Sequence, residues 1–219
     1  GLYRKIKARD GIAHIACLNG MQRKPALKRA DEMLEKYGLG DVARKKIKTL
    51  SKGMAQKVQL IAAIAHDPEF LILDEPFSGL DPVNQKLLED MVREIAARGR
   101  TIIFSTHVME HAERLCDKII LLADGHKVFD GKLDAALAHA PRNLEIETPD
   151  NKAEAVFAPL AQSMTRDGDT YHIVLKPNKQ ARHVLADSVE QGLKLIRFEP
   201  DKPSLHDAFV AMLKQEDAA

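Results

Sequence analysis

Cysteine is scarce in this sequence of 219 residues: only Cys17 and Cys116 are present, far apart in the chain. Neither lies in a pair with metal-ligand spacing, which excludes a cysteine-based metal cluster. We therefore expect two reduced, buried thiols in a cytosolic protein.

A large excess of either charge is also missing. The 33 Lys and Arg residues nearly balance the 32 Asp and Glu residues, for a net charge of +1, so charge gives no reason to expect a nucleic-acid partner. No run approaches the about eighteen apolar residues of a membrane span, and the N-terminus does not resemble a signal peptide. The sequence predicts a soluble globular chain, with a length that allows one or two domains.

The most informative stretch begins with four apolar residues, Phe70 to Leu73, that run directly into Asp74 and Glu75. This pattern predicts a buried parallel strand whose carboxyl end carries two acids. Ligands of open α/β sheets bind beyond that end. Successive side chains of a strand point to opposite sides, so one acid could hold Mg²⁺ on a phosphate while the other activates water. A strand-end turn with solvated acids is the alternative interpretation.

A helix and a second strand are predicted to follow. Asp81-Pro82 is typical of a helix start, and Gly99 closes a helix over 82–98. Its inward face is predicted to contain Val83, Leu87, Met91 and Ile95. The apolar strand 101–105 leads into His107, which would share the ligand edge with Glu75 if the two strands are neighbours.

Upstream of these strands, the pattern predicts a packed helical subdomain over about 3–66. Helices are expected over 8–18 and 25–37. Ser51 is a good N-cap for a third helix that runs to about residue 65, and Gly53 allows close backbone approach. A hydroxyl, free N–H groups and a helix N-terminus together can bind an anion. A capped helix with a glycine is common, however, so this feature is weak by itself.

Four short motifs follow one another along the chain. They are Leu50-Ser51-Lys52-Gly53-Met54, Leu71-Ile72-Leu73-Asp74-Glu75-Pro76, Ser78-Gly79-Leu80-Asp81 and Ser105-Thr106-His107. Their order and spacing resemble the signature, Walker B, D-loop and H-loop of an ATP-binding-cassette (ABC) ATPase. The resemblance covers residues 1 to about 135. It implies an α/β fold, namely a partial P-loop NTPase core with a helical subdomain.

By this resemblance, three residues act on nucleotide at the strand ends. Asp74 supports Mg²⁺, directly or through water. The catalytic residues are Glu75, which polarises the attacking water, and His107, which contacts the γ-phosphate. The implied cofactors are ATP and Mg²⁺.

The same resemblance implies residues that act across a dimer interface. Ser51 and Gly53 would reach the γ-phosphate of ATP held by the opposite subunit, and Asp81 would communicate across the interface. The family consensus Leu-Ser-Gly-Gly-Gln is altered here at Lys52 and Met54. Because the serine and the second glycine remain, phosphate contact is still expected, with the charge of Lys52 near it.

One element of the family pattern is absent from the sequence. Gly-x-x-x-x-Gly-Lys-Ser/Thr occurs nowhere, and the only Gly-Lys pair, Gly131-Lys132, is followed by Leu133. Family members carry this Walker A loop, an adenine-stacking aromatic residue and a glutamine loop before the helical subdomain. The start Gly1-Leu2-Tyr3 resembles the stretch just after the glutamine loop. We therefore expect a C-terminal portion of the subunit that is inactive alone.

Residues 139–219 are predicted to form a second domain, after an ATPase portion over 1–138 whose core covers about 67–138. The patterns alternate as β-α-β-β-α-β, which suits a small α+β unit of the ferredoxin-like kind. Strands are expected over 143–147, 163–166, 171–176 and 193–198, and helices over 151–161, 179–192 and 204–214. This domain resembles the C-terminal domain of a bacterial subgroup of transporter ATPases related to sodium and drug exporters.

The function implied is that of an ATP-binding and ATP-hydrolysing subunit that energises transport through a separate transmembrane permease. Such a subunit would form a homodimer or heterodimer and lie in the cytoplasm, peripheral to the inner face of the cell membrane. Two alternatives stay open. One is a soluble ABC ATPase of DNA repair or translation, which the near-neutral charge disfavours. The other is a non-catalytic regulatory subunit, which the missing phosphate loop suggests.

Overall fold

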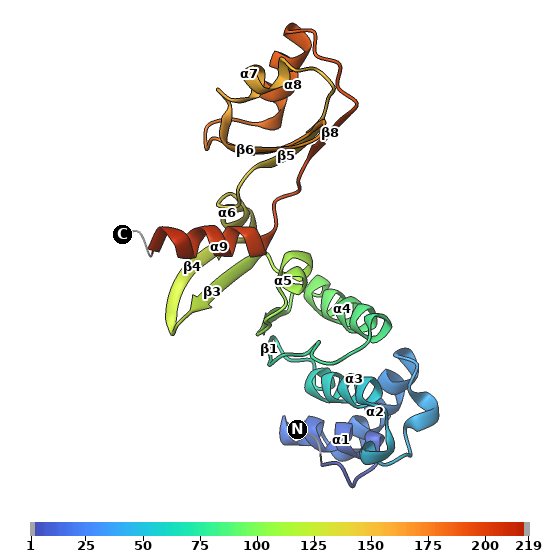
Figure 1. Ribbon diagram of the computed structural model, residues 1–219. Coiled ribbons are helices and arrows are strands. Elements are labelled where there is room, and N and C mark those ends of the chain that lie inside the picture. Colours follow the sequence, from blue (N-terminus) through green and yellow to red (C-terminus); the bar gives the residue numbers. More distant parts are fainter. Residues whose placement is uncertain (1–2, 217–219) are drawn as a thin grey trace. The chain divides into compact units, whose positions relative to one another are not determined.

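A computed structural model describes residues 3–216, and the side chains of residues 3–214. The chain divides into two compact units, Gly1–Val108 and Met109–Ala219, and each is described by itself (Figure 1). None of the helices in the described part combines the length and apolar composition that a membrane crossing requires.

The first unit begins with three packed helices, α1 (Ala8–Leu18), α2 (Arg23–Lys36) and α3 (Lys52–Ile64). Two short 3-10 turns, η1 (Gly40–Val42) and η2 (Ile47–Thr49), connect α2 to α3. Apolar residues at helical spacing meet between the helices, and Ile12, Leu34 and Ile61 are fully buried there. Three packed helices thus lie in the region predicted as a helical subdomain, and α2 begins two residues before its predicted start.

The same unit contains a parallel pair of strands, β1 (Phe70–Leu73) and β2 (Thr101–Phe104), in which Leu73 is the partner of Phe104. Helix α4 (Pro82–Ala97) connects the two strands, as expected for a βαβ crossover. Leu71 is buried beneath the pair, and the ring of Phe77 meets that of Phe104 edge-on at 5.7 Å. These contacts fix one face of the pair against the unit.

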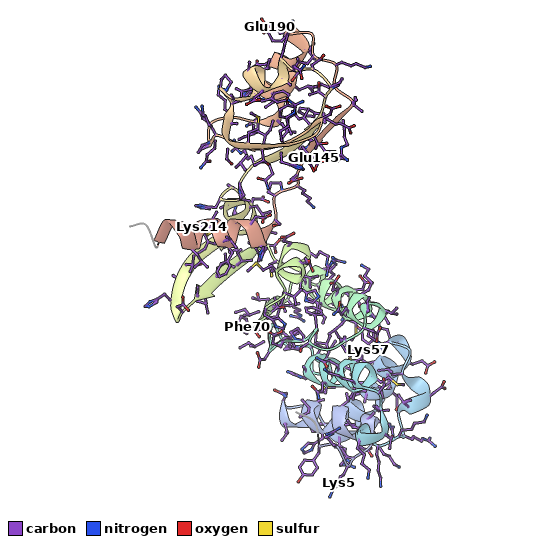
Figure 2. The ribbon with its side chains drawn as sticks, viewed as in Figure 1. Lys5, Lys57, Phe70, Glu145, Glu190 and Lys214 are labelled. Atoms are coloured by element: carbon purple, nitrogen blue, oxygen red, sulfur yellow. The ribbon has the colours of Figure 1, made fainter. Side chains whose placement is uncertain are left out.

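The opposite face of the strand pair is open, which corrects the prediction of a fully buried strand. Phe70, labelled in Figure 2, is 50% exposed, Ile72 71% and Ile103 53%. The predicted inward face of α4 is also only half correct: Met91 and Ile95 are buried, whereas Val83 and Leu87 are exposed. The unbroken apolar run predicts a strand that is covered on both faces, but among the described residues this face of the pair stays exposed.

The second unit begins with α5 (Met109–Leu115), the antiparallel hairpin β3 (Lys118–Ala123) and β4 (His126–Lys132), and α6 (Leu133–Leu137). The last helix, α9 (Leu205–Glu216), packs against α5 and α6. Their common core, called here the hairpin cluster, consists of Ile119, Ala136, Ala140, Leu205, Ala208 and Met212. Thus α9, predicted as the end of a domain over 139–219, packs with residues that precede that domain.

Between α6 and α9 lies a four-stranded antiparallel sheet in the order β6-β7-β5-β8. In sequence its elements are β5 (Asn143–Glu147), α7 (Ala153–Phe157), β6 (Ala161–Asp167), β7 (Thr170–Leu175), α8 (Ala181–Glu190) and β8 (Arg197–Pro200). Its core includes Phe157 and Tyr171, whose rings meet edge-on at 5.3 Å. Helix α7 ends at Phe157, four residues before its predicted end at residue 161.

Candidate functional site

The carboxyl end of β1 carries Asp74 and Glu75, where the sequence analysis placed them. The backbone of Glu75 has φ of +43°, in the left-handed region that residues other than glycine rarely adopt. Pro76 follows and disfavours right-handed helical geometry at Glu75. The chain therefore turns sharply at the second acid instead of continuing the strand.

The neighbouring strand holds this turn. The N–H of Ser105 donates to the carbonyl of Leu73 at 2.9 Å, which extends the parallel pairing by one residue. The Ser105 Oγ accepts from the N–H of Glu75 at 3.0 Å and donates to Oδ1 of Asp74 at 2.6 Å. One side chain of β2's end therefore contacts both acids of β1's end.

Glu75 and His107 meet across the strand ends. Nδ1 of His107 lies 2.9 Å from Oε1 of Glu75, and both side chains are open to solvent. With a proton on Nδ1, the ring donates to the carboxylate and fixes its direction. The structure thus brings together three predicted site residues, Asp74, Glu75 and His107, which with Ser105 are called here the acid edge.

The start of α3 carries the remaining predicted phosphate contacts. Ser51 is the N-cap, and its Oγ accepts from the N–H of Met54 at 3.2 Å. Lys52 and Gly53 form the first turn, so N–H groups and the positive end of the helix dipole lie here. Such an arrangement can bind an anion, although its hydroxyl already serves the helix cap.

Asp81 caps α4 in the same way. Its two carboxylate oxygens accept from the backbone N–H of Asn84 at 3.0 Å and from the side-chain amide of Asn84 at 2.6 Å. These hydrogen bonds, the side-chain one first, hold the pKa of Asp81 below its usual value. Asp81 is exposed and remains ionised at neutral pH.

The starts of α3 and α4 touch through their glycines. A Cβ on Gly53 would lie 2.8 Å from Cγ of Asn84, and one on Gly79, whose φ is +66°, would lie 1.8 Å from Nζ of Lys52. The side-chain amide of Gln56 also donates to the carbonyl of Pro76 at 2.6 Å, tying α3 to the turn after the acids. Ser51, Lys52, Gly53, Met54 and Asp81 are therefore called here the helix-start group.

The carboxylates at the acid edge suit a Mg²⁺ ion that also takes ligands from water and phosphate, and not one that is held by protein side chains alone. Within residues 3–214 no three His, Cys, Asp or Glu side chains are grouped to hold a metal ion. Mg²⁺ usually takes one or two carboxylates and completes its shell with waters and phosphate oxygens. Asp74 uses Oδ1 for Ser105 and is exposed, so its other oxygen suits such a partial set of ligands.

Ser105 is the site residue to which the sequence analysis gave no role. It is the first residue of the motif that ends in His107. A signal existed, because a hydroxyl directly after an apolar strand lies at the same sheet edge as the acids of a parallel neighbour. The pairing of Leu73 with Phe104 was needed to make that signal specific.

Comparison with known proteins gives relatives along nearly the whole chain. It is 40% identical over 214 residues to the ABC transporter ATP-binding protein YhaQ of Bacillus subtilis (strain 168), covering 96% of this chain and 70% of that protein. It is 36% identical over 212 residues to the ABC transporter ATP-binding protein BpOF4_11395 of Alkalihalophilus pseudofirmus, covering 79% of it. The Nod factor export ATP-binding protein I of Rhizobium meliloti (strain 1021) is 34% identical over 187 residues, 54% of its length.

Two further comparisons concern the fold. A family profile described as "AAA domain, putative AbiEii toxin, Type IV TA system" matches residues 36–110. A solved structure titled "Structure of ATP binding subunit of ABC transporter" has a TM-score of 0.55 and 32% identity, over 62% of this chain and 57% of that one. The fold is thus that of an α/β P-loop NTPase of the ABC type.

The chain belongs to the family of ABC transporter ATP-binding proteins. The resemblance inferred from the four motifs is therefore confirmed, together with the implied association with ATP binding and transport. The roles of individual residues at the acid edge and in the helix-start group stay predictions.

Proposed function

We propose that this chain supplies the hydrolytic edge of an ATPase that energises transport through a separate permease. The observation that supports it most is the acid edge: Glu75 and His107 are 2.9 Å apart at the ends of adjacent parallel strands, beside Asp74. Glu75 polarises the attacking water, and His107 holds the carboxylate and reaches the γ-phosphate.

Asp74 has a different role from Glu75. Its carboxylate holds Mg²⁺, directly or through water, with the phosphates of ATP completing the shell. When bound, Mg²⁺ supplies positive charge that neutralises the phosphate oxygens as the γ-phosphate leaves. Asp74 therefore contributes to nucleotide binding, whereas Glu75 contributes only as the phosphate bond breaks.

The helix-start group acts on nucleotide held by a second subunit. The N–H groups at the start of α3, with Ser51 and Gly53, receive the γ-phosphate oxygens, and Lys52 and Met54 flank them. Asp81, ionised on the adjoining helix start, links this contact to the partner across the dimer. The close approach of Gly53 on α3 to the Asn84 side chain on α4 supports a link between the two helix starts.

The open face of β1 and β2 supports an incomplete ATPase core. Parallel sheets are covered on both faces, yet Phe70, Ile72 and Ile103 are exposed here. The sequence also contains no Walker A loop. We infer that a segment carrying this phosphate loop covers the open face, and that residues 1–219 alone do not hydrolyse ATP.

The four-stranded sheet is proposed to be a ferredoxin-like accessory domain. Its element order β-α-β-β-α-β and its strand order β6-β7-β5-β8 are those of the split βαβ arrangement. Its strand ends carry no paired acids comparable with Asp74 and Glu75. This absence of a catalytic pair supports a role in self-association or regulation.

The permease is proposed to dock on the helical subdomain, which would hold the chain at the cytoplasmic face of the membrane. A groove of about 580 Å³ lies there, with Ile6, Ala13 and Leu27 among its apolar lining and Asp10 at its wall. An amphipathic cytoplasmic segment of the permease fits this lining, which also contains Arg23. Leu27→Ser should weaken co-purification with permease vesicles, whereas the outward Lys28→Ser should not. Equal recovery of both variants would contradict this docking site.

The role assignment is tested by neutralising each acid in a subunit that contains the phosphate loop as well as these residues. Glu75→Gln should lower ATP turnover by about 10²- to 10⁴-fold while ATP binding and a closed dimer persist. Asp74→Asn should instead weaken Mg²⁺-dependent ATP binding. Phosphate release and light scattering measure the two properties.

The isolated chain provides the matching control. Residues 1–219 should release no phosphate from ATP, whether they carry the parent sequence or the substitution Glu75→Gln. Robust hydrolysis by this chain alone would refute the proposal, as would an active Glu75→Gln subunit.

A further inference from the structure

We propose that Ser105 is a positioning residue that sets the geometry of both acids through a single hydroxyl. This inference rests on the function proposed above, because it assigns a purpose to the arrangement of Asp74 and Glu75. It concerns a residue that touches neither nucleotide nor water in the proposed reaction and acts only through its neighbours.

The two hydrogen bonds of Ser105 use different capacities of its hydroxyl. A serine hydroxyl has one proton to donate and lone pairs with which to accept. The proton goes to Oδ1 of Asp74 at 2.6 Å, a short bond to a carboxylate, and a lone pair accepts from the N–H of Glu75 at 3.0 Å. Both bonds can therefore exist at once, and the direction of each is fixed by the other.

The acid edge needs such a constraint at Glu75. Its φ of +43° is unfavourable for a residue with a Cβ, and such conformations persist only where surrounding contacts hold them. That turn directs the Glu75 carboxylate to His107, 2.9 Å away. By holding the Glu75 N–H, Ser105 stabilises the backbone conformation on which this contact depends.

The backbone of Ser105 is itself held in place, so its side chain can fix the positions of the two acids. Its own N–H donates to the carbonyl of Leu73 at 2.9 Å, so the backbone of β2 is joined to β1 immediately before the acids. The hydroxyl therefore holds Asp74 and Glu75 at a position that the register of β1 and β2 determines. Orienting partners of this kind typically affect metal affinity or activity by about 10- to 100-fold when removed.

The first test uses the 219-residue chain as it is and needs no nucleotide. In Ser105→Ala, amide hydrogen exchange at Glu75, followed by NMR, should become about two- to tenfold faster, the range for one net hydrogen bond. Ser105→Thr keeps the hydroxyl and should restore the parent rate. Thr101→Ala, at the other end of β2, is the matched control and should leave the Glu75 rate unchanged. An unchanged rate in Ser105→Ala would overturn the proposed bond.

The second test uses the subunit that contains the phosphate loop. Ser105→Ala should raise the Mg²⁺ concentration for half-maximal binding of a fluorescent ATP analogue by about 10- to 100-fold, and lower kcat at saturating Mg²⁺. Ser105→Thr should recover both. A merely structural role would lower Tm without changing the Mg²⁺ dependence, and would overturn the inference.

The two tests separate the inference from the function on which it rests. If the parent subunit itself fails to hydrolyse ATP, the proposed function is wrong, whereas the exchange result still decides the hydrogen bond. If the parent is active and Ser105→Ala has the same Mg²⁺ dependence and kcat, only the positioning role is wrong. Ser105→Cys, which keeps the volume with a weak donor, should fall between Ala and Thr, and replaces Ala if that variant does not fold.

Discussion

Replacing Gly79 by alanine tests how the starts of α3 and α4 are joined. Gly79 has φ of +66°, a conformation that costs a residue with a Cβ about 1–2 kcal/mol. The new Cβ would also lie 1.8 Å from Nζ of Lys52, so the ammonium group must move. Because this atom ends a flexible side chain, moving it adds only about 0.5 kcal/mol or less. The free energy of unfolding should therefore fall by about 1–2.5 kcal/mol.

A matched variant separates the two contributions. Gly99 also has a positive φ, +79°, but nothing lies within 4 Å of the Cβ it would gain, so Gly99→Ala reports the backbone cost alone. Urea unfolding followed by circular dichroism gives each loss, and Gly79→Ala should exceed Gly99→Ala slightly. In a Lys52→Ala background this excess should vanish. A neutral Gly79→Ala, or an excess that survives in that background, would refute the contact.

Two further predictions concern titratable side chains. Glu94 accepts hydrogen bonds from Lys36, Arg98 and Tyr37, which lower its pKa, so Glu94→Gln should reduce the free energy of unfolding by about 1 kcal/mol at pH 7. Because the pKa of Glu94 is lower in the folded than in the unfolded state, the stability difference between the parent and Glu94→Gln should shrink as pH falls below 4.5, the ordinary value. A difference at pH 3 as large as that at pH 7, measured by urea titration, would contradict this prediction. Burial raises the pKa of the Cys116 thiol to about 11 from 9.0. In a Cys17→Ser chain at pH 8, iodoacetamide should therefore react with Cys116 about 100-fold more slowly in the folded protein than in the urea-unfolded protein. Equal rates would contradict the burial argument, and stability should decline as pH rises from 9 towards 11.

The elements that the sequence predicted well are those with local boundaries. The strand Phe70–Leu73 was predicted at its observed ends, because an apolar run lies between Pro68 and two acids. Helix α4 was predicted to within one residue, because Asp81-Pro82 starts it and Gly99 closes it. Both depend on residues a few positions away.

What the sequence could not predict depends on distant partners. The unbroken apolar run of β1 predicts that both faces are covered, but it does not predict that Ile72 would lie open in this chain. The contact of Ser105 with Asp74 requires the register of two strands that are separated by a whole helix. Residues 193–196 were predicted as strand, although β8 begins at Arg197. Leu193 and Leu195 pack against the core of the sheet without belonging to a paired strand.

The packing of α9 into the hairpin cluster has a topological consequence. The chain leaves that cluster at Ala140 and returns to it at Leu205. The four-stranded sheet is therefore an insertion in the cluster, and two covalent connections join it there. Doubling the length of such an insertion adds only about 0.6 kcal/mol to the entropic cost of closing the loop. Sheets of other sizes could therefore occupy this position without disturbing the cluster. A truncation that begins at residue 141, by contrast, would remove α9 and expose Ile119 and Ala136.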